Sequence, residues 1–78
     1  MTEFTHHARG RMGMYQIDEA EVLAALAAPD ATTPTEQGRT NIWKRRARGG
    51  WLRVTIKTTG ATTVVITVTP RAANRGPA

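Results

Sequence analysis

The sequence predicts an α+β fold in which two N-terminal helices pack on one face of a three- to four-stranded antiparallel β-meander. Three observations support this prediction. Capping residues and apolar residues at helical spacing occupy residues 4–28, whereas residues 51–58 and 62–69 largely alternate between core-facing and outward side chains. Glycine-containing turns separate the later segments. Because an isolated hairpin is only marginally stable in water, we expect the helices to cover one face of the sheet.

The length of 78 residues and the mass of 8.5 kDa allow one domain, predicted as residues 1–70 followed by an unstructured tail of residues 71–78. With 40% hydrophobic and 22% charged residues, the composition is typical of a globular protein. The longest apolar run, residues 22–28, is far shorter than a membrane span, and no secretory signal pattern is present, so we expect no membrane partner. The lack of cysteine excludes disulfides and thiolate chemistry, and we expect a cytoplasmic location.

The first helix is predicted from His6 to about Met12. Thr5 is its candidate N-cap residue, and Gly13 lies just beyond its predicted end. Three apolar residues at a spacing of four are expected to form its buried stripe: Phe4, Ala8 and Met12.

The second helix is predicted to start after Asp18. Asp18 is the candidate N-cap, and Glu21 stands three residues later, as in a capping box. Pro29 prevents the helix from continuing past Ala28. The apolar stripe of this helix is expected to consist of Val22, Leu23 and Leu26.

The residues that follow the second predicted helix show the patterns of strands and turns. Residues 32–36 contain Pro34 and can form at best an irregular edge strand. Residues 40–48 are the next predicted strand. Gly49 and Gly50 supply the positive φ angles of a two-residue hairpin turn.

Residues 51–58 and 62–69 are the last two predicted strands, and Pro70 is expected to end the second of them. In the first, the residues expected to face the core are Leu52, Val54 and Ile56. In the second, the residues expected to face the core are Val64, Ile66 and Val68. The expected outward residues of that strand are Thr63, Val65, Thr67 and Thr69.

Charge is divided unevenly along the chain, although the formal net charge is only +5. Residues 1–38 hold all six acids and two of the eleven bases, whereas residues 39–78 hold nine bases and no acid. Such a positive region attracts polyanions, which include RNA, DNA, an acidic protein and anionic lipid. The alternative is that these side chains only solvate one surface of the protein.

The predicted nucleic-acid-binding residues come from this basic half. If the apolar residues of segment 51–58 are buried, Arg53 and Lys57 project from the opposite, open face. Trp43 or Trp51 can stack on an unpaired base, and the alternative is that both tryptophans pack within the protein. The predicted binding set is Lys44, Arg45, Arg46, Arg48, Arg53, Lys57 and Trp43.

His7 and Arg11 are the predicted catalytic residues. They stand four positions apart, so a helix places them on one side. An imidazole titrates near neutral pH and a guanidinium binds phosphate through two hydrogen bonds, so the pair can serve RNA cleavage by the 2′-hydroxyl. The alternative is that His7 is an ordinary helix residue. Adjacent helix residues such as His6 and His7 point about 100° apart, and the chain has no cysteine and no third histidine, so we expect no metal site. No phosphate-binding glycine loop is present, and we expect no cofactor.

Several short motifs follow one another along the chain: Phe4-Thr5, His7-Ala8, Arg11-Met12, Ile17, Val22, Leu26, Pro29 and residues 65–68. Over residues 4–70 their order resembles an uncharacterised bacterial and phage domain family, which opens with a His-Ala-x-x-Arg-Met helix and groups with the RelE/ParE toxin superfamily. The chain differs from that family at Tyr15-Gln16, where members have Arg-Gly, and at Thr69, where many have an aromatic residue. The resemblance implies a small toxin-like protein with two helices packed on an antiparallel sheet.

Three functions agree with these residues. The first, implied by the resemblance, is a metal-independent endoribonuclease acting on free or ribosome-bound RNA. In it His7 acts as general acid or base, and Arg11, Arg53 and either Lys44 or Arg46 neutralise the phosphate. The second is a non-catalytic nucleic-acid-binding module that uses the same basic face. The third is a protein-binding module whose basic sheet is covered by an acidic, antitoxin-like partner.

Overall fold

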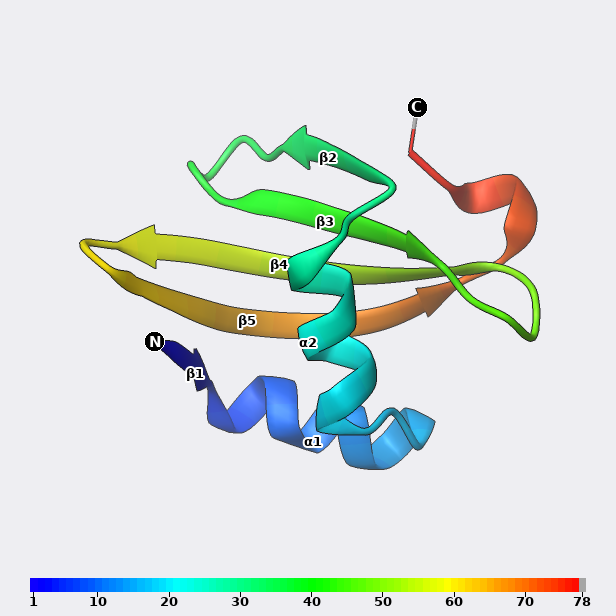
Figure 1. The fold of residues 1–78 in the computed structure, drawn as a ribbon, viewed down its shortest axis with the longest axis horizontal. Helices are drawn as coiled ribbons and strands as arrows, with labels where there is room; N and C mark the ends of the chain where they lie inside the picture. The colour runs from blue at the N-terminus through cyan, green and yellow to red at the C-terminus, as the bar shows by residue number, and fades with distance from the viewer. Residues whose placement is uncertain (78) are drawn as a thin grey trace.

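Residues 1–77, which the computed structural model describes, form two α-helices and a five-stranded sheet (Figure 1). In chain order the elements are β1 (Thr2–Phe4), α1 (His6–Tyr15), α2 (Glu19–Ala27), β2 (Ala31–Pro34), β3 (Thr40–Arg45), β4 (Trp51–Thr59), β5 (Thr62–Arg71) and a short 3₁₀ helix, η1 (Ala73–Arg75). The predicted α+β class with N-terminal helices is confirmed.

The sheet is mixed, so the prediction of a three- to four-stranded antiparallel sheet is wrong in strand number and direction. Its strand order is β1-β5-β4-β3-β2. Strands β2 to β5 form an antiparallel meander, whereas β1 pairs in parallel with β5 and places Phe4 opposite Val65. Because β1 has only three residues and directly precedes a helix, it shows no alternation that a sequence pattern can detect.

Helix α1 begins as predicted, because the Thr5 hydroxyl accepts a hydrogen bond from the backbone N–H of Ala8 at 3.0 Å. The helix ends at Tyr15, beyond its predicted end. Gln16, and not Gly13, takes the left-handed conformation (φ 55°) that closes the helix. Its backbone N–H bonds back into the last turn, which satisfies a carbonyl that the helix end would otherwise leave free.

Helix α2 also begins at its predicted cap. The Asp18 carboxylate accepts a hydrogen bond from the backbone N–H of Glu21 at 2.9 Å, and the helix ends before the proline that was expected to stop it. Its buried stripe differs from the prediction. Val22 and Ala25, three residues apart, are fully buried, whereas Leu23 is 42% exposed.

The connection between β3 and β4 is longer than the predicted two-residue turn. Strand β3 ends earlier than predicted, and residues 46–50 form a loop. The N–H of Gly49 donates to the carbonyl of Arg46 at 2.9 Å, and the N–H of Arg46 donates to the carbonyl of Gly50 at 3.1 Å. Arg46 therefore belongs to the loop and not to the strand.

Strand β5 contains a β-bulge that the alternating pattern does not predict. Thr55 lies opposite Thr67 and Ile56 lies opposite Val65, so Ile66 is an extra residue with no partner on β4. Because of this extra residue, the regular alternation of side chains between the two faces of the sheet is interrupted at Ile66.

The bulge changes which side chains reach the core. Val65 and Val68 are both 0% exposed, whereas Val64 and Ile66 are only half-buried. The prediction that Val64 and Ile66 face the core and Val65 faces outward is therefore wrong. The Thr5 hydroxyl donates a hydrogen bond to the carbonyl of Ile66 at 2.8 Å, which satisfies the backbone at the irregular position.

Strand β5 includes Pro70 and continues to Arg71, past its predicted end at Thr69. Proline is tolerated there because β1 pairs only with residues 63–65, so this end of β5 is a sheet edge. Helix η1 follows, and its Ala73 carbonyl accepts a hydrogen bond from the indole of Trp51 at 3.3 Å. The predicted unstructured tail thus begins with packed residues, and its last residue, 78, lies outside the described part of the chain.

The core lies between the two helices and one face of the sheet. Leu52 and Val54 of β4 face it as predicted, and both are 0% exposed. The buried cluster consists of Ala8, Met12, Ile17, Val22, Ala25, Ile42, Leu52, Val54, Val65 and Val68. Both helices contribute apolar side chains to this core. Neither helix within residues 1–77 is long and apolar enough to cross a membrane.

Candidate nucleic-acid interface

The face of the sheet that the helices leave uncovered gathers tryptophan and arginine side chains. We call it the helix-free face. Alternate residues of each strand belong to it, and the register of β3, β4 and β5 aligns them in adjacent rows. One row is Arg45, Trp51 and Arg71, and the next row is Trp43, Arg53 and Thr69. We refer to these six residues as the Trp–Arg cluster.

The two tryptophans form the apolar centre of the Trp–Arg cluster. Their rings are nearly perpendicular, at 88°, with centroids 6.3 Å apart. Trp43 is only 6% exposed, and its indole N–H donates to the hydroxyl of Thr33 at 2.9 Å. Trp43 is therefore a packing residue, which is the alternative that the sequence left open for it. Trp51 is half-buried and is the tryptophan that keeps ring surface toward solvent.

The C-terminal segment covers part of the Trp51 ring. The carbonyl of Ala73 accepts the indole N–H, and a Cβ atom built on Gly76 would overlap the indole. The segment therefore contacts this tryptophan at its nitrogen-bearing edge, and glycine is the residue that allows the close approach.

Two arginines lie over the tryptophan rings. The Cζ atom of Arg45 is 4.8 Å from the ring centroid of Trp51, and that of Arg53 is 5.9 Å from the ring centroid of Trp43. At these distances the negative face of the ring attracts the cation. The ring contact holds each arginine on the helix-free face, and neither guanidinium forms an ion pair within residues 1–77.

Arg53 and Arg71 lie close enough to repel one another. The pKa of Arg53 is lowered, first by burial of the guanidinium and then by the positive charge of Arg71. The Nε atoms of both residues are buried and have no hydrogen-bond partner within residues 1–77. Neither guanidinium forms an ion pair in that part of the chain. The Trp–Arg cluster therefore concentrates positive charge that the described protein groups do not compensate.

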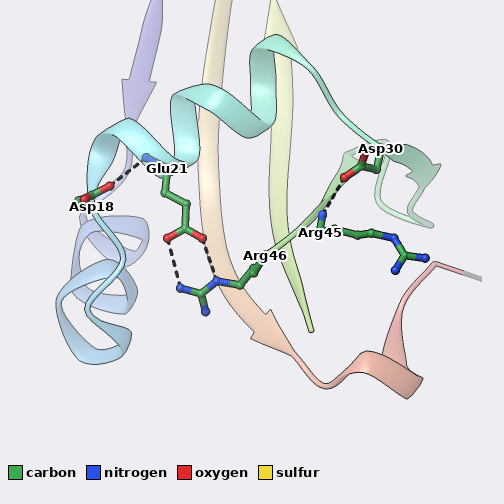
Figure 2. Close-up of polar contacts among 5 residues, drawn as sticks. All are labelled: Asp18, Glu21, Asp30, Arg45 and Arg46. Carbon is green, nitrogen blue, oxygen red and sulfur yellow. Dashed lines mark hydrogen bonds and ion pairs between the residues drawn. The ribbon is translucent and has the colours of Figure 1, made fainter. Parts of the chain in front are cut away.

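Two acidic side chains near the sheet, Glu21 and Asp30, pair with bases outside the Trp–Arg cluster. Figure 2 shows both acids. Glu21 accepts two hydrogen bonds from Arg46, from Nε at 2.8 Å and from Nη2 at 3.2 Å. Asp30 lies 3.9 Å from the Nζ atom of Lys44. Asp30 also accepts the backbone N–H of Arg45 at 2.8 Å, while the guanidinium of Arg45 extends away from it (Figure 2).

Four of the seven predicted nucleic-acid-binding residues lie on the helix-free face. Three are in the Trp–Arg cluster, and Lys57 is exposed farther along the same side of β4. The four residues are Trp43, Arg45, Arg53 and Lys57. Arg48 is exposed in the loop between β3 and β4, where it lines a depression together with Glu21 and Arg46.

Lys44 and Arg46 do not lie on this face. Lys44 is opposite the buried Leu52, which places it on the helix-covered side, and it donates to the carbonyl of Ala28 at 2.8 Å. The side chain of Arg46 is only 9% exposed in its ion pair with Glu21. Both bases hold α2 or the segment after it to the sheet.

The remaining three members of the Trp–Arg cluster are Trp51, Thr69 and Arg71, none of which belongs to the predicted binding set. The alternation that points Thr69 outward also points Arg71 outward, provided that the strand continues through Pro70. Alternation therefore predicts an outward-facing Arg71, but the expectation that Pro70 ends the strand excludes Arg71 from it.

The predicted catalytic pair lies on the opposite side of the molecule. His7 and Arg11 line a surface depression of about 320 Å³ on α1, together with Gly10 and Met14. The guanidinium of Arg11 donates to the hydroxyl of Tyr15 at 3.3 Å. Because α1 packs on the helix-covered face, the structure brings His7 and Arg11 together but does not bring them to the Trp–Arg cluster. Within residues 1–77 no group of three or more metal-ligating side chains converges.

Comparisons with protein-family models, with curated proteins and with solved structures find no match to this chain. The resemblance of residues 4–70 to the RelE/ParE superfamily therefore stays a prediction. Function has to be inferred from the geometry of the helix-free face and from the distribution of charge around it.

Proposed function

We propose that the helix-free face binds single-stranded nucleic acid, with RNA as the ligand class. One observation gives the strongest support: two adjacent rows of the sheet present Arg45, Arg53 and Arg71 and contain no carboxylate. Arginine binds phosphate through paired hydrogen bonds, and the release of counterions from neutralised phosphates supplies most non-specific affinity for nucleic acid.

Charge beyond the Trp–Arg cluster extends this positive surface. Of the nine bases in residues 39–78, only Lys44 and Arg46 form ion pairs within the described part of the chain. The other seven are Arg39, Arg45, Arg48, Arg53, Lys57, Arg71 and Arg75. A polyanion that follows the sheet therefore meets several bases in succession, as ligands of single-strand-binding grooves do.

The Trp51–Arg45 pair supports a preference for unpaired bases. Trp51 is half-buried, and Arg45, an exposed residue, lies over its ring. Both an indole and a guanidinium stack on nucleobases, and this stacking tolerates any base sequence. A double helix hides its base faces, so these two side chains favour single strands.

The proposal can be tested by fluorescence anisotropy with a labelled single-stranded RNA of about 12 nucleotides, a length within the range of known single-strand sites. Binding is measured between about 50 and 200 mM salt for the wild-type chain and for Arg45→Gln. We expect the logarithm of the binding constant to fall linearly with the logarithm of the salt concentration. In a plot of the logarithm of the binding constant against the logarithm of salt concentration, the slope of the variant should be smaller in magnitude by roughly 0.7 for each phosphate contact removed.

Arg9→Gln is the matched control for this experiment. It removes the same charge from α1, where Arg9 is exposed and lies 3.9 Å from Glu19. Its binding curve should overlay that of the wild type. Equal weakening by Arg9→Gln and Arg45→Gln, or binding that does not respond to salt, would contradict the proposal.

A second candidate function is metal-independent RNA cleavage at the α1 depression. The observation in its favour is that His7 and Arg11 line the same depression. The RelE/ParE resemblance implies this activity, together with an acidic antitoxin-like partner. Of the phosphate-binding residues expected for this activity, only Arg11 lies beside His7, whereas Arg53 is on the other face and Lys44 and Arg46 are held by acids.

RNA incubated with the chain in the presence of a chelator separates the two functions. An endoribonuclease produces discrete fragments, and His7→Ala abolishes them while leaving RNA affinity unchanged. The binding function predicts intact RNA and an affinity that depends on Arg45 and not on His7. Fragments that persist in His7→Ala would remove the catalytic role of this histidine.

A further inference from the structure

Arg53 and Arg71 lie on neighbouring strands, and their Nε atoms have no hydrogen-bond acceptor within residues 1–77. Arg53 is opposite Thr69, two residues before Arg71. Both Nε atoms are buried and unpartnered within residues 1–77, and neither residue forms an ion pair there. A guanidinium has five N–H donors and no acceptor, so the two side chains together present many hydrogen-bond donors at one place on the sheet.

Arg53 is held in place before a ligand arrives, and the Nε atom of Arg71 is buried beside it. Arg53 lies over the ring of Trp43, and the hydrogen bond from Trp43 to Thr33 fixes that ring in turn. Arg71 lies in the β4–β5 ladder and lines a hollow of about 230 Å³ together with Pro70, Ala72 and Arg75. A ligand therefore finds the Arg53 donors already positioned, which reduces the entropy lost on binding.

We propose that Arg53 and Arg71 form a subsite for a phosphoryl group that carries two negative charges. Two guanidinium groups are neutralised by a dianion, whereas a phosphodiester with one charge leaves one of the two positive charges uncompensated. A phosphate monoester is largely dianionic at neutral pH because its second pKa is about 6. The ligand is then the terminal phosphate of a strand bound on the helix-free face, an identity that rests on the function proposed above.

The subsite itself is tested with inorganic phosphate. Thermal unfolding is followed in phosphate and in chloride of equal ionic strength, for the wild type, Arg53→Gln, Arg71→Gln and the control Arg9→Gln. We expect phosphate to raise the Tm of the wild type and of Arg9→Gln above the chloride value, because a ligand that binds the folded state stabilises it. Either cluster variant should lose this increase.

Stability in chloride separates a binding role from a structural role. Arg71→Gln removes one of two repelling charges, so its Tm in chloride should equal or exceed that of the wild type. A Tm that falls in chloride, together with an unchanged response to phosphate, would show that Arg71 only supports the fold and would overturn the subsite.

The dianion preference is tested with RNA strands that differ only at one end. Wild type is titrated with the same oligonucleotide bearing a 5′-phosphate, a 3′-phosphate or hydroxyls at both ends. We expect one phosphorylated form to bind roughly tenfold more tightly than the hydroxyl form, the value of about one charge-assisted hydrogen bond. Arg71→Gln should remove this difference, and Arg71→Lys should restore only part of it.

The outcomes distinguish the subsite from the function on which its ligand rests. Equal affinity of all three strands, with no stabilisation by phosphate, overturns the subsite and leaves strand binding intact. Stabilisation by phosphate that depends on Arg53 and Arg71, without binding of any strand, supports the subsite and contradicts nucleic-acid binding.

Discussion

Thr5 is a single side chain that connects helix α1 to the bulge of β5. Its hydroxyl accepts a hydrogen bond from the N–H of Ala8 at 3.0 Å and donates one to the carbonyl of Ile66 at 2.8 Å. Its backbone N–H donates to the carbonyl of Val65 at 3.0 Å. One residue thus satisfies a helix terminus and an irregular strand position that lie far apart in the sequence.

We expect Thr5→Val to lower the free energy of unfolding by about 1–3 kcal/mol, because valine keeps the branched shape but loses both hydroxyl hydrogen bonds. Thr5→Ser keeps the hydroxyl and is expected to lose less. Urea denaturation followed by tryptophan fluorescence measures both variants. Equal losses in the two would show that the methyl group, and not the hydroxyl, supplies the stabilisation.

Gly50 occupies a position where both conformation and space exclude a side chain. Its φ is +78°, and a Cβ atom on it would lie 2.6 Å from the carbonyl oxygen of Arg71. Gly60 has a φ of +60°, but no atom lies near its missing Cβ. We therefore expect Gly50→Ala to destabilise the fold by more than Gly60→Ala, which should cost only about 1 kcal/mol for the left-handed conformation.

Thermal unfolding of the two alanine variants provides the measurement. A larger decrease of Tm for Gly50→Ala than for Gly60→Ala is the expected result. If the two decreases are the same, the contact with Arg71 has no energetic consequence and only the backbone angle matters.

At the residue scale, the role of a side chain was predicted correctly where its bonding partner lies only a few positions away in the sequence. The caps at Thr5 and Asp18 are of this kind, since each bonds to a backbone N–H three residues later. Val65 could not be assigned to the core, because its burial depends on the bulge and on pairing with β1. Arg46 could not be assigned to an ion pair, because Glu21 stands 25 positions away.

At the scale of elements, the Glu21–Arg46 pair joins α2 to the loop between β3 and β4. The pair has two hydrogen bonds, and the side chain of Arg46 is only 9% exposed, so loss of one partner leaves a nearly buried charge. We expect Glu21→Gln to lower the free energy of unfolding by about 1–3 kcal/mol. The Asp18 cap is unaffected, because it bonds to the backbone of residue 21.

Glu19→Gln is the control for this prediction. Glu19 lies 3.9 Å from Arg9, and both side chains are more than half exposed. Such a surface pair contributes only about 0–1 kcal/mol, so this variant should unfold near the wild-type denaturant concentration. Equal midpoints for Glu19→Gln and Glu21→Gln in chemical denaturation would mean that the α2–loop connection adds nothing to stability.

The position of a candidate site residue was predictable where the alternation of a single strand determines which face of the sheet it lies on. Alternation along β4 places Arg53 on the face opposite Leu52 and Val54, as expected. The contribution of β3 was only partly predictable, because the early end of that strand assigns Arg46 to a loop. Whether a given base stays available for a ligand depends on acids contributed by α2 and the segment after it, which no strand pattern contains.

At the scale of the whole molecule, the division of charge along the sequence becomes a division in space. Residues 1–38 form β1, both helices and the edge strand β2, and residues 39–78 supply the three adjacent strands β3, β4 and β5. The acid-free half of the sequence therefore forms most of the helix-free face. The exceptions, Lys44 and Arg46, are the bases that hold the two halves together.

This spatial division predicts which nuclear magnetic resonance signals respond to RNA. The two indole N–H groups have different partners, Ala73 for Trp51 and Thr33 for Trp43. Trp51 is the more exposed, and its hydrogen bond is longer, at 3.3 Å against 2.9 Å. We expect RNA to shift the Trp51 indole signal strongly and the Trp43 signal weakly. The imidazole signals of His7 should not move, because α1 lies on the other face; the reverse pattern would place the ligand in the α1 depression and contradict binding by the sheet.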